Sequence, residues 1–219
     1  MEVVFGGIIT ILVAIWIEWL RTPKLDLRIE SNILDIPPAG GQTARRHLRV
    51  VLRNKALPRA LQWIQRSAAL QCQGQVAFHS DDNHKLNLFG NAMRIRWANS
   101  PEPMGITGQI IDLHNPAQVI SRIISMGAAI PTIDVYPGEE EILDIAVRFD
   151  GEDDFYGWNN ESYFNNWRTP AWEMPKGKYL VKVEISSSGS KCTNTFRLFN
   201  QMNVLTSFRL EDVPEDQKI

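Results

Sequence analysis

The sequence predicts a mainly β protein, in which an N-terminal transmembrane helix precedes one antiparallel β-sandwich. Three observations predict this fold: an uncharged apolar run at the N-terminus, many short segments that alternate apolar and polar residues, and Gly- and Pro-rich turns between those segments. Strands alternating with long helical patterns, which would indicate a parallel sheet, are not seen. We expect an anchor at 1–24, a sandwich at 25–213 and a short C-terminal tail at 214–219.

The N-terminal run from Val3 to Ile17 contains no charged residue. Continued as a helix to Leu20, it would be about 27 Å long at 1.5 Å per residue, close to the roughly 30 Å of a hydrocarbon core. Trp16 and Trp19 fall where an interfacial aromatic belt is expected. A cleaved signal peptide is the alternative, but it would begin with basic residues and end at small ones. We therefore expect a retained, single-pass signal-anchor.

Basic residues follow this run, and none precedes it. Arg21, Lys24 and Arg28 lie just after the helix, and Lys and Arg are enriched on the cytoplasmic side of membrane proteins. This flank predicts a protein of the plasma (inner) membrane with its C-terminal domain in the cytoplasm. Glu18 can reach Arg21 three residues later, so its carboxylate need not be buried alone.

Small residues recur every four positions along one stripe of the predicted helix, at Gly6, Thr10 and Ala14. Small residues at this spacing let two helices approach closely in lipid. The stripe therefore predicts a packing seam for a partner helix or for a second copy of the chain. The alternative is the chance composition of an apolar span.

The rest of the chain is typical of β-structure, because apolar and polar residues alternate with period two between turn-forming clusters. One segment differs: in 58–70, Leu61, Ile64 and Ala68 fit one face of a short amphipathic helix. The clearest strand candidates are 25–30, 47–53, 142–149, 179–186, 194–199 and 207–210, and the weaker ones are 70–78, 92–97 and 117–124.

Two phrases carry a resemblance to a known fold. Residues 135–149 (VYPGEEEILDIAVRF) resemble the Pro-Gly-Glu turn and core strand of many bacterial immunoglobulin-like modules. Residues 174–200, which contain MPKGKYLVKVEISSSG and TFRLFN, resemble their closing hairpin. The resemblance implies an immunoglobulin-like sandwich and no particular activity. A looser likeness, to bacterial single-span proteins with a β-rich domain and no known activity, rests on the junction residues Glu18, Leu20, Arg21, Pro23 and Leu25.

The net charge of −2 provides no bulk attraction to nucleic acid, and we expect no nucleic-acid partner. This average hides an asymmetry. Residues 21–99 carry 13 Lys and Arg against 5 Asp and Glu, whereas residues 100–219 carry 10 against 18. Either the two halves neutralise each other in the fold, or a basic, membrane-proximal face rests on anionic headgroups.

Familiar motifs for catalysis and metal binding are missing. The sequence has no G-x-S-x-G, H-E-x-x-H, Walker or dinucleotide-binding phrase, and no C-x-x-C. Turns at 79–84 and 150–154 contain clustered acids and could hold a divalent ion, but solvated turns have the same composition. Cys72 and Cys192 are too few for a disulfide framework and are expected to be free thiols. We expect no cofactor, no metal and no enzymatic activity.

The stretch from Phe155 to Trp172 holds seven of the chain's twenty aromatic residues. It lies in a connection of 29 residues between two predicted strands, much longer than a usual hairpin loop. Three interpretations stay open: a lid packed on the sandwich, a protein interface, or a site for a small molecule or glycan. The candidate interface residues are Trp158, Tyr163, Phe164, Trp167, Arg168 and Trp172.

These features predict a membrane-anchored, non-enzymatic accessory or scaffold protein. Its partners would be membrane lipid and either another membrane protein or a second copy of the chain. The alternative is a ligand-sensing sandwich that binds a small molecule or glycan through the 155–172 loop, with Arg168, Asn160 and Glu161 as polar contacts. An enzyme with a dispersed active site is a third hypothesis, and it requires several perturbed polar side chains meeting in a cleft.

Overall fold

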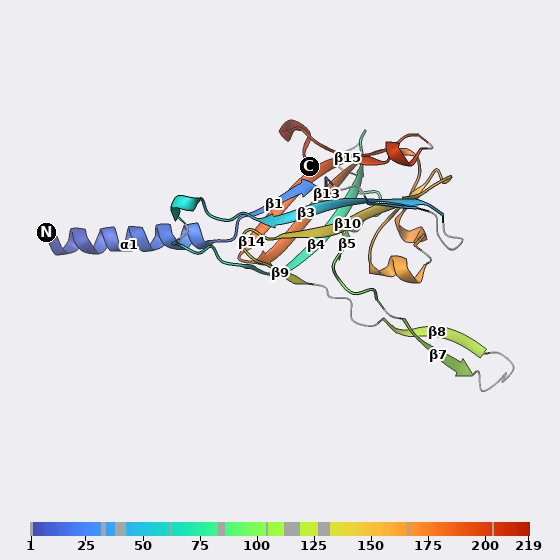
Figure 1. Ribbon diagram of the computed structural model, residues 1–219, viewed down its shortest axis with the longest axis horizontal. Helices are drawn as coiled ribbons and strands as arrows, with labels where there is room; N and C mark the ends of the chain where they lie inside the picture. Colours follow the sequence, from blue (N-terminus) through green and yellow to red (C-terminus); the bar gives the residue numbers. More distant parts are fainter. Residues whose placement is uncertain are drawn as a thin grey trace.

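The computed structural model describes residues 2–31, 34–37, 43–61, 63–82, 86–103, 105–111, 119–126, 132–165, 167–202 and 204–219, with backbone alone for 2–6, 34, 105–111 and 119–126. Within these residues one α-helix, α1 (Glu2–Arg21), projects from one end of a β-body, and the N-terminus lies at its far tip (Figure 1). The body contains two antiparallel sheets of several strands. This confirms the predicted mainly β fold and is consistent with a sandwich.

Helix α1 ends at Arg21, one residue beyond the Leu20 to which the sequence predicts it. The amide of Thr22 donates to the Glu18 carbonyl at 3.1 Å, and Pro23, which has no amide hydrogen, cannot extend the helical hydrogen bonds. The Arg21 guanidinium lies 3.4 Å from the Glu18 carboxylate, as the spacing of the two residues predicts.

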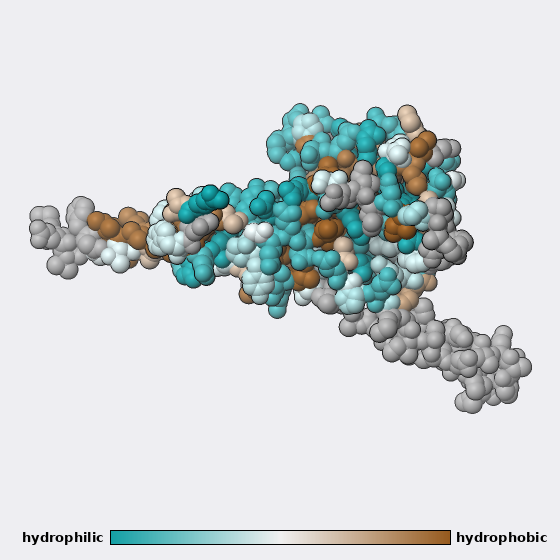
Figure 2. All heavy atoms as spheres, viewed as in Figure 1, coloured by the Kyte–Doolittle hydropathy of each residue, from teal (hydrophilic) through white to brown (hydrophobic). Residues whose placement is uncertain are grey.

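The described side chains of α1 face solvent over most of its length. Every residue from 7 to 16 is exposed, and the exposed fractions of the large apolar side chains between Ile8 and Ile15 range from 47% to 61%. They appear as a brown band on the helix in Figure 2. Counting only residues with described side chains, which in α1 start at Gly7, no helix reaches the length and apolarity of a membrane span.

The first sheet, called sheet 1, has the strand order β1-β3-β10-β11-β12, with β2 paired to β3 and β6 paired to β10. All pairings are antiparallel, and β3 pairs with β10 along almost its whole length. The strands are β1 (Leu25–Ile29), β2 (Leu34–Ile36), β3 (Arg45–Asn54), β6 (Arg96–Trp97), β10 (Glu140–Phe149), β11 (Phe155–Gly157) and β12 (Glu173–Met174).

The second sheet, called sheet 2, has the order β15-β14-β13-β4-β5, with β9 paired to β4. Its centre is the β13–β14 hairpin, which turns at Gly189 with a φ of 87°, a conformation that favours glycine. The strands are β4 (Ala69–Ser80), β5 (Met93–Arg94), β9 (Ile133–Val135), β13 (Gly177–Ser188), β14 (Ser190–Asn200) and β15 (Arg209–Asp212).

Shorter elements complete the chain. Strands β7 (Gly105–Ile111) and β8 (Val119–Met126) form a separate antiparallel pair that extends away from the two sheets in Figure 1. The 3-10 turns are η1 (Arg59–Leu61), η2 (Asn160–Phe164), η3 (Pro170–Trp172), η4 (Leu205–Ser207) and η5 (Glu215–Gln217).

The core lies between the two sheets and comes from the alternate, inward-facing residues of each strand. Sheet 1 contributes Val50 and Leu52, and sheet 2 contributes Val76, Phe78 and Val183, all fully buried. Removing these side chains from water is the main favourable term in folding. The core therefore explains the alternation seen in the sequence.

The end of α1 is packed against the β-body. Ile17 and Leu20 of the helix join Leu57, Leu61 and Ile64, from the segment between β3 and β4, in one apolar cluster. Of these, Leu20, Leu57 and Ile64 are buried. The cluster sets the direction in which the helix leaves the body.

The predicted amphipathic helix over 58–70 is wrong. In the described part of this segment only Arg59–Leu61 is helical, and it forms a single 3-10 turn. Ile64 is buried, as its apolar character predicts, but the backbone bonds elsewhere: the Ser67 amide donates to the Arg21 carbonyl at 2.7 Å. Tertiary contacts therefore override the local periodicity.

Asn54, the last residue of β3, joins three segments at this end of the body. Its side-chain oxygen accepts from the Lys24 amide at 3.2 Å, and its side-chain nitrogen donates to the carbonyls of Ser67 and Val135 at 3.1 Å each. The side chain is fully buried. It therefore connects the residues after α1 to both sheets.

Replacing Asn54 by Asp is expected to lower the free energy of unfolding by about 3 kcal/mol. A carboxylate has no hydrogen to donate to the two carbonyls, and its charge would be buried without a partner. Chemical denaturation of the full chain in mild detergent measures the change. The control, Asn91→Asp, alters an exposed asparagine and should shift stability by less than about 0.5 kcal/mol. Equal effects of the two substitutions would contradict the role of Asn54.

Ion pairs join the basic and acidic halves of the chain. Part of the charge asymmetry is thus neutralised inside the fold, as the first of the two alternatives predicts. The structure pairs four arginines of residues 21–99 with two acids of residues 100–219: Arg28 and Arg53 with Glu140, and Arg49 and Arg96 with Asp144.

Candidate functional site

The aromatic loop folds over the outer face of sheet 1, the face that points away from sheet 2. Four buried side chains of β10, β11 and the following residue form an apolar cluster on that face, and two loop residues pack against it. We call this the lid cluster. Its buried members are Val147, Phe149, Tyr156 and Trp158, and its loop members are Tyr163 and Trp167.

A β-bulge in β10 decides which residues face the loop. The pairing with β3 shifts between Asp144 and Ala146, and both Ile145 and Ala146 lie in the core. Because the bulge adds one residue, the alternation resumes with Val147 and Phe149 on the outer face. The bulge therefore places two apolar side chains beneath the loop.

Trp158 lies at the centre of the lid cluster and is 3% exposed. Its ring meets His47 edge-on at 4.8 Å and Tyr163 at 5.6 Å between ring centroids. The next turn, η2, has a capping box at its N-terminus. The Asn159 side chain accepts from the Ser162 amide at 3.2 Å, and the Ser162 hydroxyl accepts from the Asn159 amide at 3.1 Å. This cap fixes the position of Tyr163.

A buried ion network lies beneath Tyr163. The Asp144 carboxylate accepts from Arg49 Nε at 2.7 Å and from Arg96 Nη1 at 3.1 Å. Arg96 also donates to three backbone carbonyls within residues 97–100. Its guanidinium carbon lies 5.0 Å from the Tyr163 ring centroid, within cation–π range. The network therefore connects the loop to three strands of sheet 1.

Trp167 and Arg168 close the loop. Trp167 has a φ of 61°, a left-handed conformation that is rare for a large side chain. The Arg45 guanidinium lies 4.7 Å from the Trp167 ring centroid. Arg168 bonds Glu152 through Nε at 2.8 Å and stacks 3.9 Å from the ring centroid of Phe149. These contacts hold a strained turn in place.

Trp172 packs at the other end of the loop. Its ring meets Phe89 edge-on at 4.9 Å between centroids. A Cβ on Gly157 would lie 2.8 Å from Met93 Sδ and 3.1 Å from Trp172 Cβ, so a larger residue here would force the Met93 side chain to move.

The loop uses most of its aromatic surface in packing. Of the six candidate interface residues, Trp158 is buried and the other five, including Phe164, are half-buried. Arg168, an expected ligand contact, is engaged with Glu152. The packing favours the lid interpretation and leaves partial faces of five side chains for a partner.

His47 is buried beneath the lid, and neither of its ring nitrogens has a hydrogen-bond partner among the described residues. Burial lowers the pKa of His47 to about 3, with Arg49 and Arg45 acting in the same direction and Asp35 opposing them. The native state therefore keeps this imidazole neutral, whereas an unfolded chain takes up a proton near the ordinary pKa of about 6.5.

The unfolded state binds more protons than the native state between pH 6.5 and pH 3, so stability falls as the pH falls through this window. His47 alone should remove about 2 kcal/mol between pH 7 and pH 5. Denaturation midpoints at several pH values measure this loss. In His47→Gln the loss should be smaller by that amount, and an unchanged pH dependence would contradict the buried, neutral state of His47.

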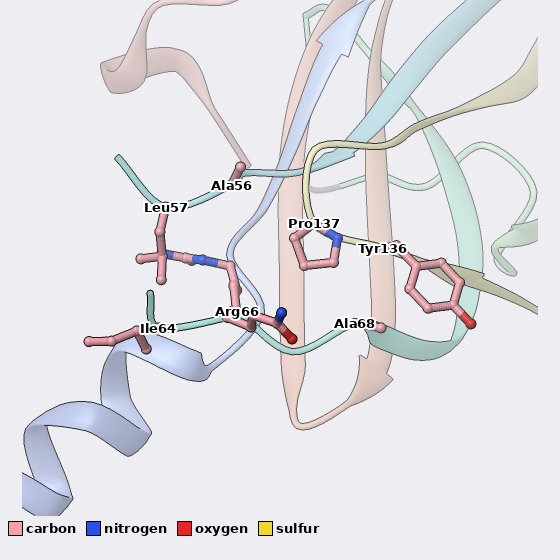
Figure 3. Close-up of a pocket in the computed structure, with 8 residues that line it drawn as sticks. Ala56, Leu57, Ile64, Arg66, Ala68, Tyr136 and Pro137 are labelled. Carbon is pink, nitrogen blue, oxygen red and sulfur yellow. The ribbon is translucent and has the colours of Figure 1, made fainter. Parts of the chain in front are cut away.

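A second site lies at the end of the body from which α1 leaves. It is a cavity of about 490 Å³ between the segment after β3 and the turn after β9 (Figure 3). This cavity was not predicted from the sequence; its one signal is the presence of Arg59, Trp63 and Arg66 close to the predicted anchor. The lining residues are Ala56, Leu57, Ile64, Gln65, Arg66, Ala68, Tyr136 and Pro137.

Arg66 is the charged side chain of this cavity, and Figure 3 shows it reaching toward Leu57. Its Nη1 donates to the Thr22 carbonyl at 3.3 Å, and its Nε is buried without a partner among the described residues. Burial lowers the pKa of Arg66. The aromatic side chains nearby are open to solvent, since Trp63 is 71% and Tyr136 is 55% exposed.

The structure separates the three predicted topology residues. Arg21 pairs with Glu18, Lys24 is exposed in the connector, and Arg28 pairs with Glu140 on the surface of sheet 1.

The predicted packing seam lies on α1. Thr10 and Ala14 are exposed, and Gly6 lies in the helix among the residues described by backbone alone.

The part of the chain that the structure describes contains no cluster of side chains that could bind a metal ion. There, no three His, Cys, Asp or Glu side chains are placed to hold a metal ion. His84 of the 79–84 turn lies outside the described residues. Both cysteines are free, as expected, and burial raises the pKa of Cys72 to about 11 and that of Cys192 in the same direction.

No protein family, no curated protein and no solved structure matches the chain. Function is therefore inferred from the geometry of the molecule itself.

Proposed function

We propose that this chain is a single-pass, membrane-anchored interaction protein, with α1 in the bilayer and the β-body in a non-enzymatic accessory or scaffolding role. The observation that carries the proposal is the exposure of α1, where every residue from 7 to 16 faces solvent. The uncharged run continues in the sequence back to Val3. Soluble monomers rarely leave a contiguous apolar surface of this kind in water, so a lipid or protein environment is needed to cover it.

The free energy at stake is large. Six bulky apolar side chains of α1 are about half exposed: Ile8, Ile9, Ile11, Leu12, Val13 and Ile15. Burying the exposed part of each gains roughly 1 kcal/mol or more, so the helix gains on the order of 6–10 kcal/mol by leaving water. Trp16 and Trp19, 48% and 68% exposed, follow at the level where an interfacial belt would lie.

Two further features support an interaction role for the anchored body. Strands β7 and β8 pair only with each other among the described strands, and an isolated two-stranded pair is marginally stable in water. The exposed stripe of Thr10 and Ala14 on α1 offers a close-packing surface to another helix. The partner would be a membrane protein or a second copy of the chain, and the basic flank of Arg21 and Lys24 favours a cytoplasmic body.

Introducing charge into α1 tests the anchor. The double variant Ile11→Arg/Leu12→Arg should lose membrane association, because each arginine at a helix centre costs about 3 kcal/mol, or roughly 100-fold in partition. Flotation with vesicles and resistance to alkaline extraction measure the association. Val204→Arg, which charges an apolar side chain of the body that is 57% exposed, is the matched control and should stay with the membrane. A double variant that floats with vesicles as the wild type does would contradict the proposal.

A further inference from the structure

We propose that the α1-proximal end of the β-body is a docking surface for anionic membrane lipid, in which the cavity beside Arg66 receives the phosphate of a headgroup. We call this end the basal surface; it consists of the described residues 21–24, 55–61, 63–68 and 136–139. The inference rests on the proposed function, because α1 has to hold the basal surface at the bilayer.

The basal surface is fixed relative to α1. The helix end is clamped by the apolar cluster of Leu20, Leu57 and Ile64, and Asn54 hydrogen-bonds the connector to both sheets. With a rise of about 1.5 Å per residue, the basal surface begins within one or two helical turns of Trp16. An α1 in the membrane would therefore bring this surface to the headgroup level.

Exposed aromatic side chains lie on the basal surface and next to it. Trp19 on α1, Trp63 in the segment after β3 and Tyr136 in the turn after β9 are 68%, 71% and 55% exposed. Three separate segments thus present large amphipathic rings at the same end of the molecule. Tryptophan and tyrosine are enriched at membrane interfaces, because one part of the ring is apolar and the other is a hydrogen-bonding group.

The cations of the basal surface include three that pair with no acid among the described residues. Lys24, Arg59 and Arg66 form no ion pair with any residue that the structure describes. Each basic residue close to an anionic membrane contributes about 1 kcal/mol of attraction.

The acids at this end are engaged. Glu18 and Asp26 pair with Arg21 and Lys55, at 3.4 Å and 3.0 Å. The carboxylates of Asp134 and Glu139 accept hydrogen bonds from backbone amides of their neighbourhood, at 2.8 Å and 3.3 Å. Among the described residues, none of these four acids forms an ion pair with Lys24, Arg59 or Arg66, so these three cations can meet an external anion.

The cavity has the chemistry that a headgroup requires. Its volume of about 490 Å³ falls within the usual range of small-molecule sites, roughly 300–1,000 Å³. Arg66 lines its wall and forms no ion pair with a described residue, and a guanidinium is well suited to a phosphate. The walls from Leu57 and Ile64 are apolar and suit the first carbons of the acyl chains.

The first experiment compares lipids. The full chain is placed in nanodiscs of phosphatidylcholine with about 20% phosphatidylglycerol, and native mass spectrometry counts the lipids that it retains. The wild type should prefer phosphatidylglycerol, and Arg66→Gln should lower this preference by about fivefold, the equivalent of one cation at an anionic surface. The control is Arg94→Gln, which removes an exposed arginine of sheet 2 and should leave the preference unchanged.

The second measurement locates Trp63 and does not depend on Arg66. The difference in fluorescence between the wild type and Trp63→Phe isolates the signal of this residue, and nitroxide lipids labelled at the headgroup should quench it. Quenching places the basal surface against the membrane. An unquenched Trp63 overturns the inference.

The outcomes separate the two proposals. If the chain fails to enter the discs at all, the anchor itself is wrong. If it enters but shows no preference for phosphatidylglycerol, the anchor stands and the headgroup site is refuted. Arg66-dependent binding of inorganic phosphate without a lipid preference would also refute the lipid assignment, in favour of a soluble phosphate ligand.

Discussion

Replacing Asp144 by Asn is expected to lower the free energy of unfolding by about 3–5 kcal/mol, because it leaves two arginines beneath the lid without their counter-charge. Asp144 is 2% exposed, and its partners Arg49 and Arg96 are 20% and 4% exposed. The Arg96 guanidinium has almost no access to bulk water when the carboxylate is neutralised, and that of Arg49 has only partial access. Chemical denaturation of the full chain in mild detergent measures the loss.

The chain contains a matched control for this substitution. Glu140 also bridges two arginines, Arg28 and Arg53, but its side chain is 36% exposed and theirs are 51% and 41% exposed. Glu140→Gln should therefore cost less than about 1 kcal/mol, since solvent screens an exposed pair. If the two substitutions cost the same, the network beneath Tyr163 is not the buried support that its geometry indicates.

Replacing Trp158 by Ala is expected to cost about 3–5 kcal/mol and to loosen the whole lid. The indole is buried between His47 and Tyr163, and its removal leaves a cavity under η2. Denaturation measures the stability, and limited proteolysis within residues 159–172 measures the loosening of the loop.

Trp63→Ala is the control for the lid substitution, because Trp63 is 71% exposed and should contribute less than about 0.5 kcal/mol to stability. A stable Trp158→Ala with an unchanged cleavage pattern would show that the loop does not depend on the lid cluster. The half-buried aromatic residues would then be open to a partner after all.

The long strands were predictable because one face of each strand is buried between the two sheets, so apolar and polar residues alternate along it. Segments 179–186 and 194–199 pair residue for residue within β13 and β14. Strands β2, β9, β11 and β12 have two or three residues each, too few to show a period, and they were missed. β7 was missed as well, since glycines interrupt its apolar residues.

The two sites were only partly predictable. The composition of 155–172 left a lid, a protein interface and a small-molecule or glycan site open. The choice depends on the bulge at Ile145, which was not predicted from the sequence of β10. The Arg96–Asp144 pair joins residues 48 positions apart, a contact that only the fold creates. The basal cavity likewise needs two loops to meet, each of which runs between the two sheets.

The environment of α1 is the central claim, and spin labels along the helix test it most directly. Single cysteines are introduced at positions 8 to 16 of the full chain in vesicles and labelled, with the two native free cysteines, Cys72 and Cys192, replaced by alanine. Oxygen, which dissolves in lipid, should reach the labels better than a water-soluble nickel reagent at each bulky position. Labels that the nickel reagent reaches better throughout would place α1 in water or against protein, and would contradict the membrane anchor.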